Sequence, residues 1–219
     1  MVAKSLSWLT TFTSPGLTTG VVVLVDGGAA RYSNRYISTE ALAAETAAGE
    51  ALWTGINERP DFSRPGGPFK DTANTDLVYH GGRLLALWWL GGPAYHVELP
   101  SLETRGQYDF NGALPKGLSA HPKLDPVTGE LMVFDFDVLP PYLTYGVLSD
   151  DGSLVHHTEV ELPGPRLLHD LVITERHTIF LDFPLMWDPK LLAQGKARVM
   201  FDASLPARFG VLERHADGA

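Results

Sequence analysis

The sequence predicts an all-β protein with one or two short helices, and two observations support this class. From Asn74 onward, short β-rich segments alternate with turns that contain glycine, proline or aspartate. Only one segment, Ala41–Trp53, has the alanine-rich composition of a helix. Short and regularly spaced strands are typical of a sandwich, a barrel or a propeller, and their periodicity does not choose among these three folds.

The composition excludes several classes of protein. The chain has 219 residues, of which 44% are hydrophobic, so it can bury a core as one large or two small domains. It has no cysteine, which excludes disulfides, iron–sulfur clusters and thiolate metal sites, so any metal must be bound by His, Asp or Glu. The net charge of −9 argues against a nucleic-acid partner.

Neither a transmembrane segment nor a signal peptide is expected. The longest aliphatic run, Val21–Val25, is far too short to span a bilayer. Residues 1–20 lack the continuous apolar region of a signal peptide. We therefore expect a cytoplasmic protein.

The strands are assigned from hydrophobic runs and turn residues. A buried strand is expected at 20–26, followed by a turn at Gly27-Gly28 and by an alternating strand at 29–38. Further strands are expected at 75–80, 84–89, 94–98, 102–104, 131–136, 142–148, 154–160, 167–174 and 178–182.

The helix is expected over 41–53. Ser38 or Thr39 can cap its amino end, and Glu40 places a negative charge in the first turn, where it suits the helix dipole. We expect this helix to pack outside the sheets. The proline-rich segment 55–72 that follows is predicted to be a loop.

Two histidine motifs lie in the second half of the chain. The first is SAHPKLDPVTGE at 119–130, and the second is GPRLLHDLVITE at 164–175. A lone histidine in a β protein is more often a hydrogen-bonded core residue than a metal ligand, and Pro122 is expected to hold His121 extended. Two histidines, each within its own motif, favour metal binding by His121 and His169.

Together the two motifs resemble the first two iron-ligand motifs of the carotenoid cleavage oxygenases, a family that includes stilbene-cleaving dioxygenases. The resemblance extends over roughly 29–214. It implies that 1–219 is a single partial domain of a seven-bladed β-propeller, without the family's N-terminal region and last blades. Shorter matches lie at 31–36, 73–75, 83–87, 102–104, 182–185 and 204–212, although an ordinary hairpin strand is the preferred role for 31–36.

The resemblance also implies a chemistry. A non-haem Fe(2+) would be held by four histidines, of which His121 and His169 are the first two, and imidazole is a suitable ligand for iron. The family cleaves a conjugated double bond of a carotenoid, apocarotenoid or stilbene with O2 and gives carbonyl products. Such a substrate is an apolar polyene or stilbene, and the sequence does not choose between the two. With only two of the four histidines, the chain alone is expected to be inactive.

Other polar residues near the motifs are weaker ligand candidates. Adjacent side chains in a strand point to opposite faces, so Asp170 should point away from a metal held by His169. The same reasoning weakens His156 and His157 as a chelating pair. Surface or packing roles are expected for the remaining histidines: His80, His96, His177 and His215.

One departure from the family pattern bears on metal binding. The family has a glutamate that holds a ligand histidine, and here the corresponding place reads Trp88-Trp89-Leu90. Glu98 and Glu103 are near in sequence but cannot be placed at that site. This favours a non-catalytic, degraded relative that binds an apolar ligand, whereas the intact histidine pair favours an oxygenase fragment. A metal-free β-sandwich binding protein is the third alternative.

A partial propeller cannot close its ring. We therefore expect several small antiparallel sheets side by side, with open strand edges and exposed apolar faces that promote self-association.

Overall fold

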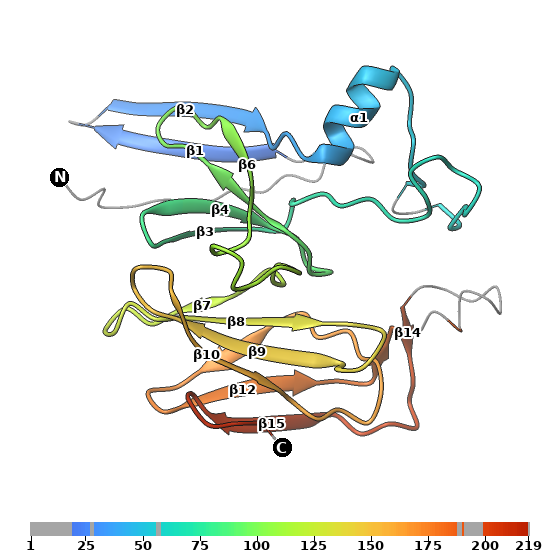
Figure 1. Ribbon diagram of the computed structural model, residues 1–219, viewed down its shortest axis with the longest axis vertical. Helices are drawn as coiled ribbons and strands as arrows, with labels where there is room; N and C mark the ends of the chain where they lie inside the picture. The colour runs from blue at the N-terminus through green and yellow to red at the C-terminus, as the bar shows by residue number, and fades with distance from the viewer. Residues whose placement is uncertain (1–18, 27–28, 56–57, 188–189, 191–198, 219) are drawn as a thin grey trace.

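The all-β prediction is confirmed by the computed structural model, which describes residues 19–26, 29–55, 58–187, 190 and 199–218. Within these residues, every pairing between named strands is antiparallel, and α1 (Glu40–Ala48) is the α-helix that they contain in full. The sheets follow one another along the long axis of the molecule (Figure 1). They do not close into a ring, in agreement with the expected partial propeller.

Five sheets account for the described strands. A hairpin contains β1 (Thr19–Asp26) and β2 (Ala29–Tyr36). The first four-stranded sheet contains, in this order, β3 (Asp76–His80), β4 (Arg83–Leu87), β5 (Ala94–Val97) and β6 (Thr104–Tyr108). The second contains β10 (Leu154–Glu159), β9 (Leu143–Leu148), β8 (Leu131–Phe136) and β7 (Lys123–Leu124). A three-stranded sheet contains β11 (Leu171–Ile173), β12 (His177–Asp182) and β15 (Arg208–Glu213), and β13 (Leu185–Met186) pairs with β14 (Met200–Phe201).

The second four-stranded sheet is buried on both faces. Successive side chains of β8 alternate between two hydrophobic clusters, because neighbouring residues of a strand point to opposite faces. Leu131 and Val133 pack toward the first sheet, whereas Met132, Phe134 and Phe136 pack toward the three-stranded sheet. This sheet is therefore the centre of a stack of three, as a blade inside a propeller is.

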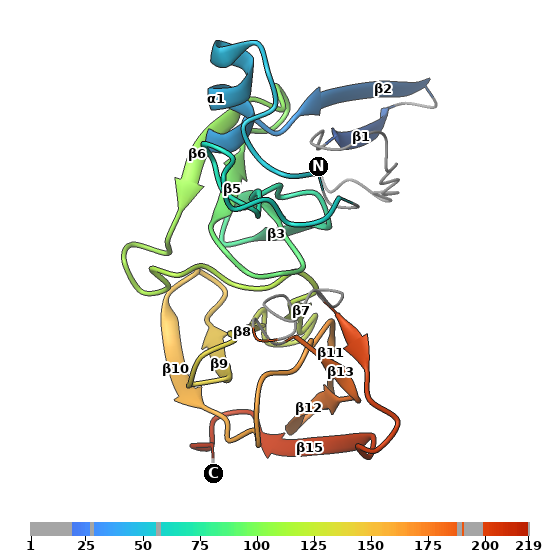
Figure 2. The same cartoon turned by 90° about the vertical axis from the view of Figure 1, so that its right-hand side faces the viewer.

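The first sheet shows the same alternation. Leu85 and Leu87 of β4 pack against the second sheet, whereas Leu84 and Ala86 pack on the opposite side, beneath the segment that contains Ile37. The β1/β2 hairpin projects from this end of the molecule, where α1 also lies outside the sheets (Figure 2).

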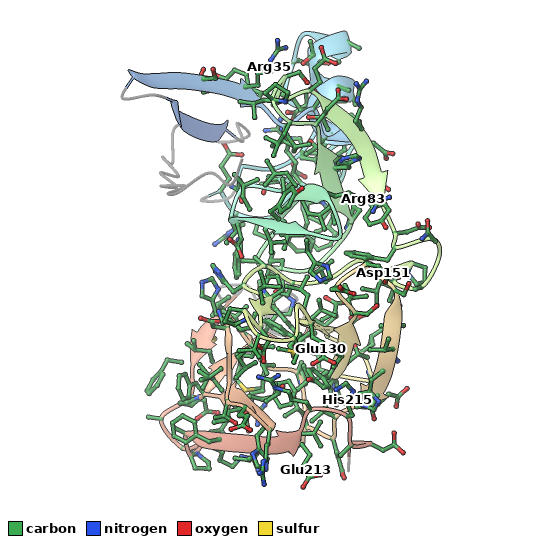
Figure 3. The ribbon with its side chains drawn as sticks, turned by 90° about the vertical axis from the view of Figure 1, so that its left-hand side faces the viewer. Arg35, Arg83, Glu130, Asp151, Glu213 and His215 are labelled. Atoms are coloured by element: carbon green, nitrogen blue, oxygen red, sulfur yellow. The ribbon has the colours of Figure 1, made fainter. Side chains whose placement is uncertain are left out.

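Polar contacts fix the three-stranded sheet against the second sheet. The hydroxyls of Tyr145 and Thr178 form a buried hydrogen bond of 2.8 Å between the two sheets. At the end of β15, the buried Arg214 forms ion pairs with Asp125 and Glu130. Oε1 of Glu130 also lies 3.2 Å from Nε2 of His215 (Figure 3). Asp125 directly follows β7 and Glu130 directly precedes β8, so these contacts attach the last strand to the second sheet.

Several element boundaries differ from the sequence prediction, most of all at 102–104, where β6 begins only at Thr104, and at the helix and the strand at 167–174. The helix ends at Ala48 rather than at 53, because Gly49 adopts a left-handed conformation and its N–H bonds to the carbonyl of Glu45. Thr39 is the residue that caps its amino end. The strand predicted at 167–174 is shortened to β11, since the backbone N–H of Leu167 bonds instead to Leu185 outside the sheet.

Candidate functional site

The two motif histidines meet at the edges of neighbouring sheets. His121 lies two residues before β7, and His169 lies two residues before β11. Each of these strands is the edge strand of its sheet, and the two strands lie next to each other. The imidazole rings are consequently in contact, with centroids 4.9 Å apart and an interplanar angle of 65°. The fold therefore brings together the two histidines that the motifs predicted as metal ligands, and their role as ligands stays a prediction.

The backbone at His121 is not extended, so that prediction was wrong. His121 has φ +67°, in the left-handed region that residues other than glycine rarely adopt. Its N–H donates to Oδ2 of Asp76 at 2.9 Å, and Nδ1 of its ring lies 3.6 Å from the same oxygen. The proline that follows disfavours the right-handed helical region, and the contact with Asp76 selects the left-handed one.

His169 is exposed at the surface, although its ring also contacts that of Trp89. Partial desolvation lowers the pKa of its imidazole, the neighbouring His121 lowers it further, and Asp170 opposes the shift. A neutral imidazole is therefore favoured, and this is the form that binds metals. The ring centroids of Trp89 and His169 are 6.1 Å apart, and those of Trp89 and Trp187 are 6.5 Å apart.

Asp170 has a role that the sequence did not suggest. Its Oδ1 lies 2.6 Å from Nζ of Lys123 and also accepts the N–H of Leu171. Lys123 belongs to the first motif and Asp170 to the second, so this ion pair joins the two segments that carry the histidines. Within the part of the chain that is described, no group of three or more His, Cys, Asp or Glu side chains is placed to hold a metal.

Three other histidines occupy surface or packing positions. His156 and His157 alternate in exposure along β10, and Nε2 of His156 lies 3.0 Å from the carbonyl of Ala216. His80 is buried, with Nε2 3.0 Å from the carbonyl of Gly129.

The nearby glutamates do not replace the missing family carboxylate. Glu98 and Glu103 both form ion pairs with Arg105. Both lie at the β5–β6 connection, away from the edge strands that carry the histidines.

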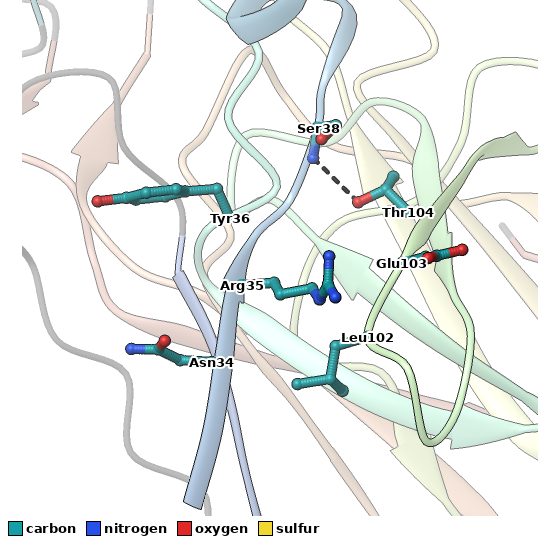
Figure 4. Close-up of a pocket in the computed structure, with 7 residues that line it drawn as sticks. All are labelled: Asn34, Arg35, Tyr36, Ser38, Leu102, Glu103 and Thr104. Atoms are coloured by element: carbon teal, nitrogen blue, oxygen red, sulfur yellow. Dashed lines mark hydrogen bonds between the residues drawn. The ribbon is translucent and has the colours of Figure 1, made fainter.

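A separate hollow of about 600 Å³ lies at the opposite end of the molecule from β15. The end of β2 and the turn before β6 line it, and the N–H of Ser38 donates to Thr104 across it at 2.9 Å (Figure 4). Neither motif histidine lines this hollow, so it is not part of the histidine site.

The chain is similar in sequence to known proteins over most of its length. The profile of the family described as retinal pigment epithelial membrane protein, RPE65, matches residues 10–219. The chain is 37% identical over 214 residues to a carotenoid 9,10(9',10')-cleavage dioxygenase 1 of Arabidopsis thaliana, covering 89% of this chain and 40% of that protein. It is 42% identical over 149 residues to a carotenoid 9,10(9',10')-cleavage dioxygenase of Crocus sativus, covering 66% and 27%.

Solved structures give the same result. The lignostilbene dioxygenase of Pseudomonas brassicacearum superposes with a TM-score of 0.82 at 31% identity, covering 91% of this chain and 42% of that one. A cobalt-substituted apocarotenoid oxygenase of Synechocystis superposes with a TM-score of 0.73 at 26% identity, covering 90% and 45%. The open stack of antiparallel sheets and these similarities are thus those of an oxygenase family rather than of a β-sandwich binding protein. The chain belongs to the RPE65 family of carotenoid cleavage oxygenases.

The match is partial with respect to the relatives. The chain spans about two fifths of the length of the Arabidopsis protein and of the Pseudomonas structure. No helix among the described residues is both long and apolar enough to cross a membrane. A cytoplasmic location stays a prediction.

Proposed function

We propose that this chain forms part of an Fe(II)-dependent dioxygenase that cleaves a conjugated double bond of a carotenoid, apocarotenoid or stilbene with O2. The contact between the His121 and His169 rings carries this proposal, because two imidazoles converging from separate motifs are the arrangement that one metal requires. The complete protein would close a seven-bladed propeller around this point. The dioxygenase names of the relatives support the reaction class.

The residues present fit part of an iron site. Both rings offer nitrogen donors, and the lowered pKa of His169 keeps that ring in the neutral form needed for binding. Bound iron would supply the redox chemistry for O2. The chain's own residues would hold the metal through His121 and His169, while Trp89 and Trp187 would form an apolar wall beside it.

A second function is favoured by Trp89. The family glutamate accepts a hydrogen bond from a ligand histidine, whereas an indole is only a donor and cannot accept one. Trp89 faces His169 at 6.1 Å, so the site is less polar than a metal centre with an acceptor at this position. A non-catalytic relative that binds an apolar ligand at this aromatic wall is therefore the alternative.

Metal titration tests the proposal. We expect anaerobic calorimetry to detect weak binding of Fe(II) or Co(II) at one site, and His121→Ala and His169→Ala should each weaken it by at least about tenfold. The matched control is His157→Ala, on the exposed face of β10, which should bind as the parent does. Binding that all three variants retain equally would contradict the assignment of these two ligands.

We also propose that the chain self-associates through β15. This strand pairs with β12 on one edge, and no described strand pairs with its other edge. Phe209 and Val211 of β15 are 66% and 62% exposed. Unpaired apolar edges of this kind recruit further strands.

Sedimentation velocity over a range of concentrations tests this association. We expect oligomers that Val211→Lys reduces, since a charged edge opposes strand pairing. Val127→Lys is the matched control, because Val127 is 90% exposed in the turn after β7. A single monomeric species at every concentration of the parent chain would refute the proposal.

A further inference from the structure

We propose that Asp76 is a positioning residue that sets the tautomer and orientation of His121. The effect on metal binding rests on the proposed function. The effect on the His121 ring does not, because it depends only on contacts between protein atoms. Asp76 is the first residue of β3, which is the edge strand of the first sheet. β3, β7 and β11 therefore bring Asp76, His121 and His169 together from the beginnings of three edge strands.

The carboxylate of Asp76 is held by its own strand. Its Oδ1 accepts the N–H of Leu77 at 2.8 Å, which fixes the side chain relative to β3. Its Oδ2 accepts the backbone N–H of His121 at 2.9 Å, across 45 residues of sequence. The first sheet thereby holds Oδ2 of Asp76 against the backbone of His121.

This oxygen also acts on the ring. Nδ1 of His121 lies 3.6 Å from Oδ2 of Asp76, which is beyond a full hydrogen bond but within the range of a strong electrostatic attraction. A carboxylate at this position favours the tautomer with the proton on Nδ1. The lone pair is then on Nε2, which is the nitrogen left available to a metal.

The same contact stabilises an uncommon backbone conformation. A left-handed residue other than glycine persists only when its surroundings hold it there, and His121 has φ +67°. The hydrogen bond from its N–H to Asp76 supplies this restraint. Without it, the residue before Pro122 should relax to the extended region and turn its ring away from His169.

The two histidines are therefore supported differently. His121 has an acceptor in Asp76, whereas His169 faces Trp89, whose indole offers none. Asp170, the carboxylate next to His169 in sequence, is engaged by Lys123. Asp76 should therefore contribute more to the alignment of the pair than either of these neighbours.

Nitrogen-15 NMR of the histidine-labelled chain tests the inference without metal. At an alkaline pH at which the ring is neutral, His121 should carry its proton mainly on Nδ1. Asp76→Ala should shift it to the Nε2-protonated tautomer and remove the ring-to-ring contact with His169. Asp76→Asn keeps an acceptor for the backbone N–H but loses the charge, so it should change the tautomer and retain the contact. Asp109→Asn, at an exposed aspartate after β6, is the control and should change neither.

Cobalt(II) titration then separates this inference from the proposed function. Asp76→Ala should weaken Co(II) binding roughly 10–100-fold, as loss of a group that orients a ligand does. An unchanged tautomer in both Asp76 variants would overturn the inference; if Asp76→Ala does not fold, Asp76→Asn alone decides. If the Asp76 variants change the tautomer of His121 but the parent chain binds no Co(II), the role of Asp76 is upheld and the metal site is refuted.

Discussion

The 219-residue chain is expected to release no aldehyde from an apocarotenoid or a hydroxystilbene under air with added ferrous iron. Two histidines leave about four positions of an octahedral iron to water, so the metal is weakly held and easily lost. Open sheets also cannot exclude water from an apolar channel as a closed propeller would. The expected loss is complete, since both the ligand set and the enclosure are deficient.

Activity should return when the remaining part of the propeller is supplied, either in one longer chain or by a complementing fragment. His121→Ala and His169→Ala should each abolish the restored activity, and His157→Ala should not. Turnover by the 219-residue chain alone, abolished by both alanine substitutions, would show that a two-histidine site suffices. A complemented protein that remains inactive would instead favour the non-catalytic relative.

The second large effect concerns Trp89. We expect Trp89→Glu to strengthen Fe(II) binding by roughly 10–100-fold, because the new carboxylate can accept a hydrogen bond from His169. The sequence left the choice between Trp89 and Leu90 open. Both residues pack against the hydrophobic cluster around Phe134, but the structure favours Trp89, because its ring meets that of His169. Leu90→Glu should therefore reduce stability without any gain in affinity.

Trp89→Leu is the matched variant for this experiment, since it removes the indole without adding an acceptor. Anaerobic calorimetry on the parent and the variants measures the affinity, and thermal unfolding by circular dichroism first establishes that each variant folds. An equal gain for Trp89→Leu and Trp89→Glu would show that the indole only obstructs the site. No gain for Trp89→Glu would refute the idea that a missing acceptor weakens it.

Local patterns in the sequence were sufficient to predict most of the architecture. In β4 and β8, apolar residues occupy both faces, which is the pattern of a strand inside a stack of sheets. The strands predicted at 75–80 and 84–89 correspond to β3 and β4, which pair as antiparallel neighbours. The histidine motifs predicted the family, because a motif is a local property of the chain.

The end of the helix shows where local patterns become insufficient. Alanine-rich composition extends the predicted helix to 53, yet one glycine in the left-handed conformation ends it at Ala48. The carboxylate of Glu45 then accepts the N–H of Leu52, so a side chain replaces the helical bond beyond that point. Propensity averaged over a segment does not resolve a single capping residue.

The sequence by itself determined that the chain is all-β, that it resembles the carotenoid cleavage oxygenases, and that His121 and His169 are its candidate ligands. Only the tertiary structure brought the two rings to 4.9 Å and placed Asp76 beside His121 in its left-handed conformation. It also paired Lys123 with Asp170. The physical reason is that these contacts join edge strands of different sheets, so the packing of the sheets sets their geometry and no local spacing in the chain encodes it.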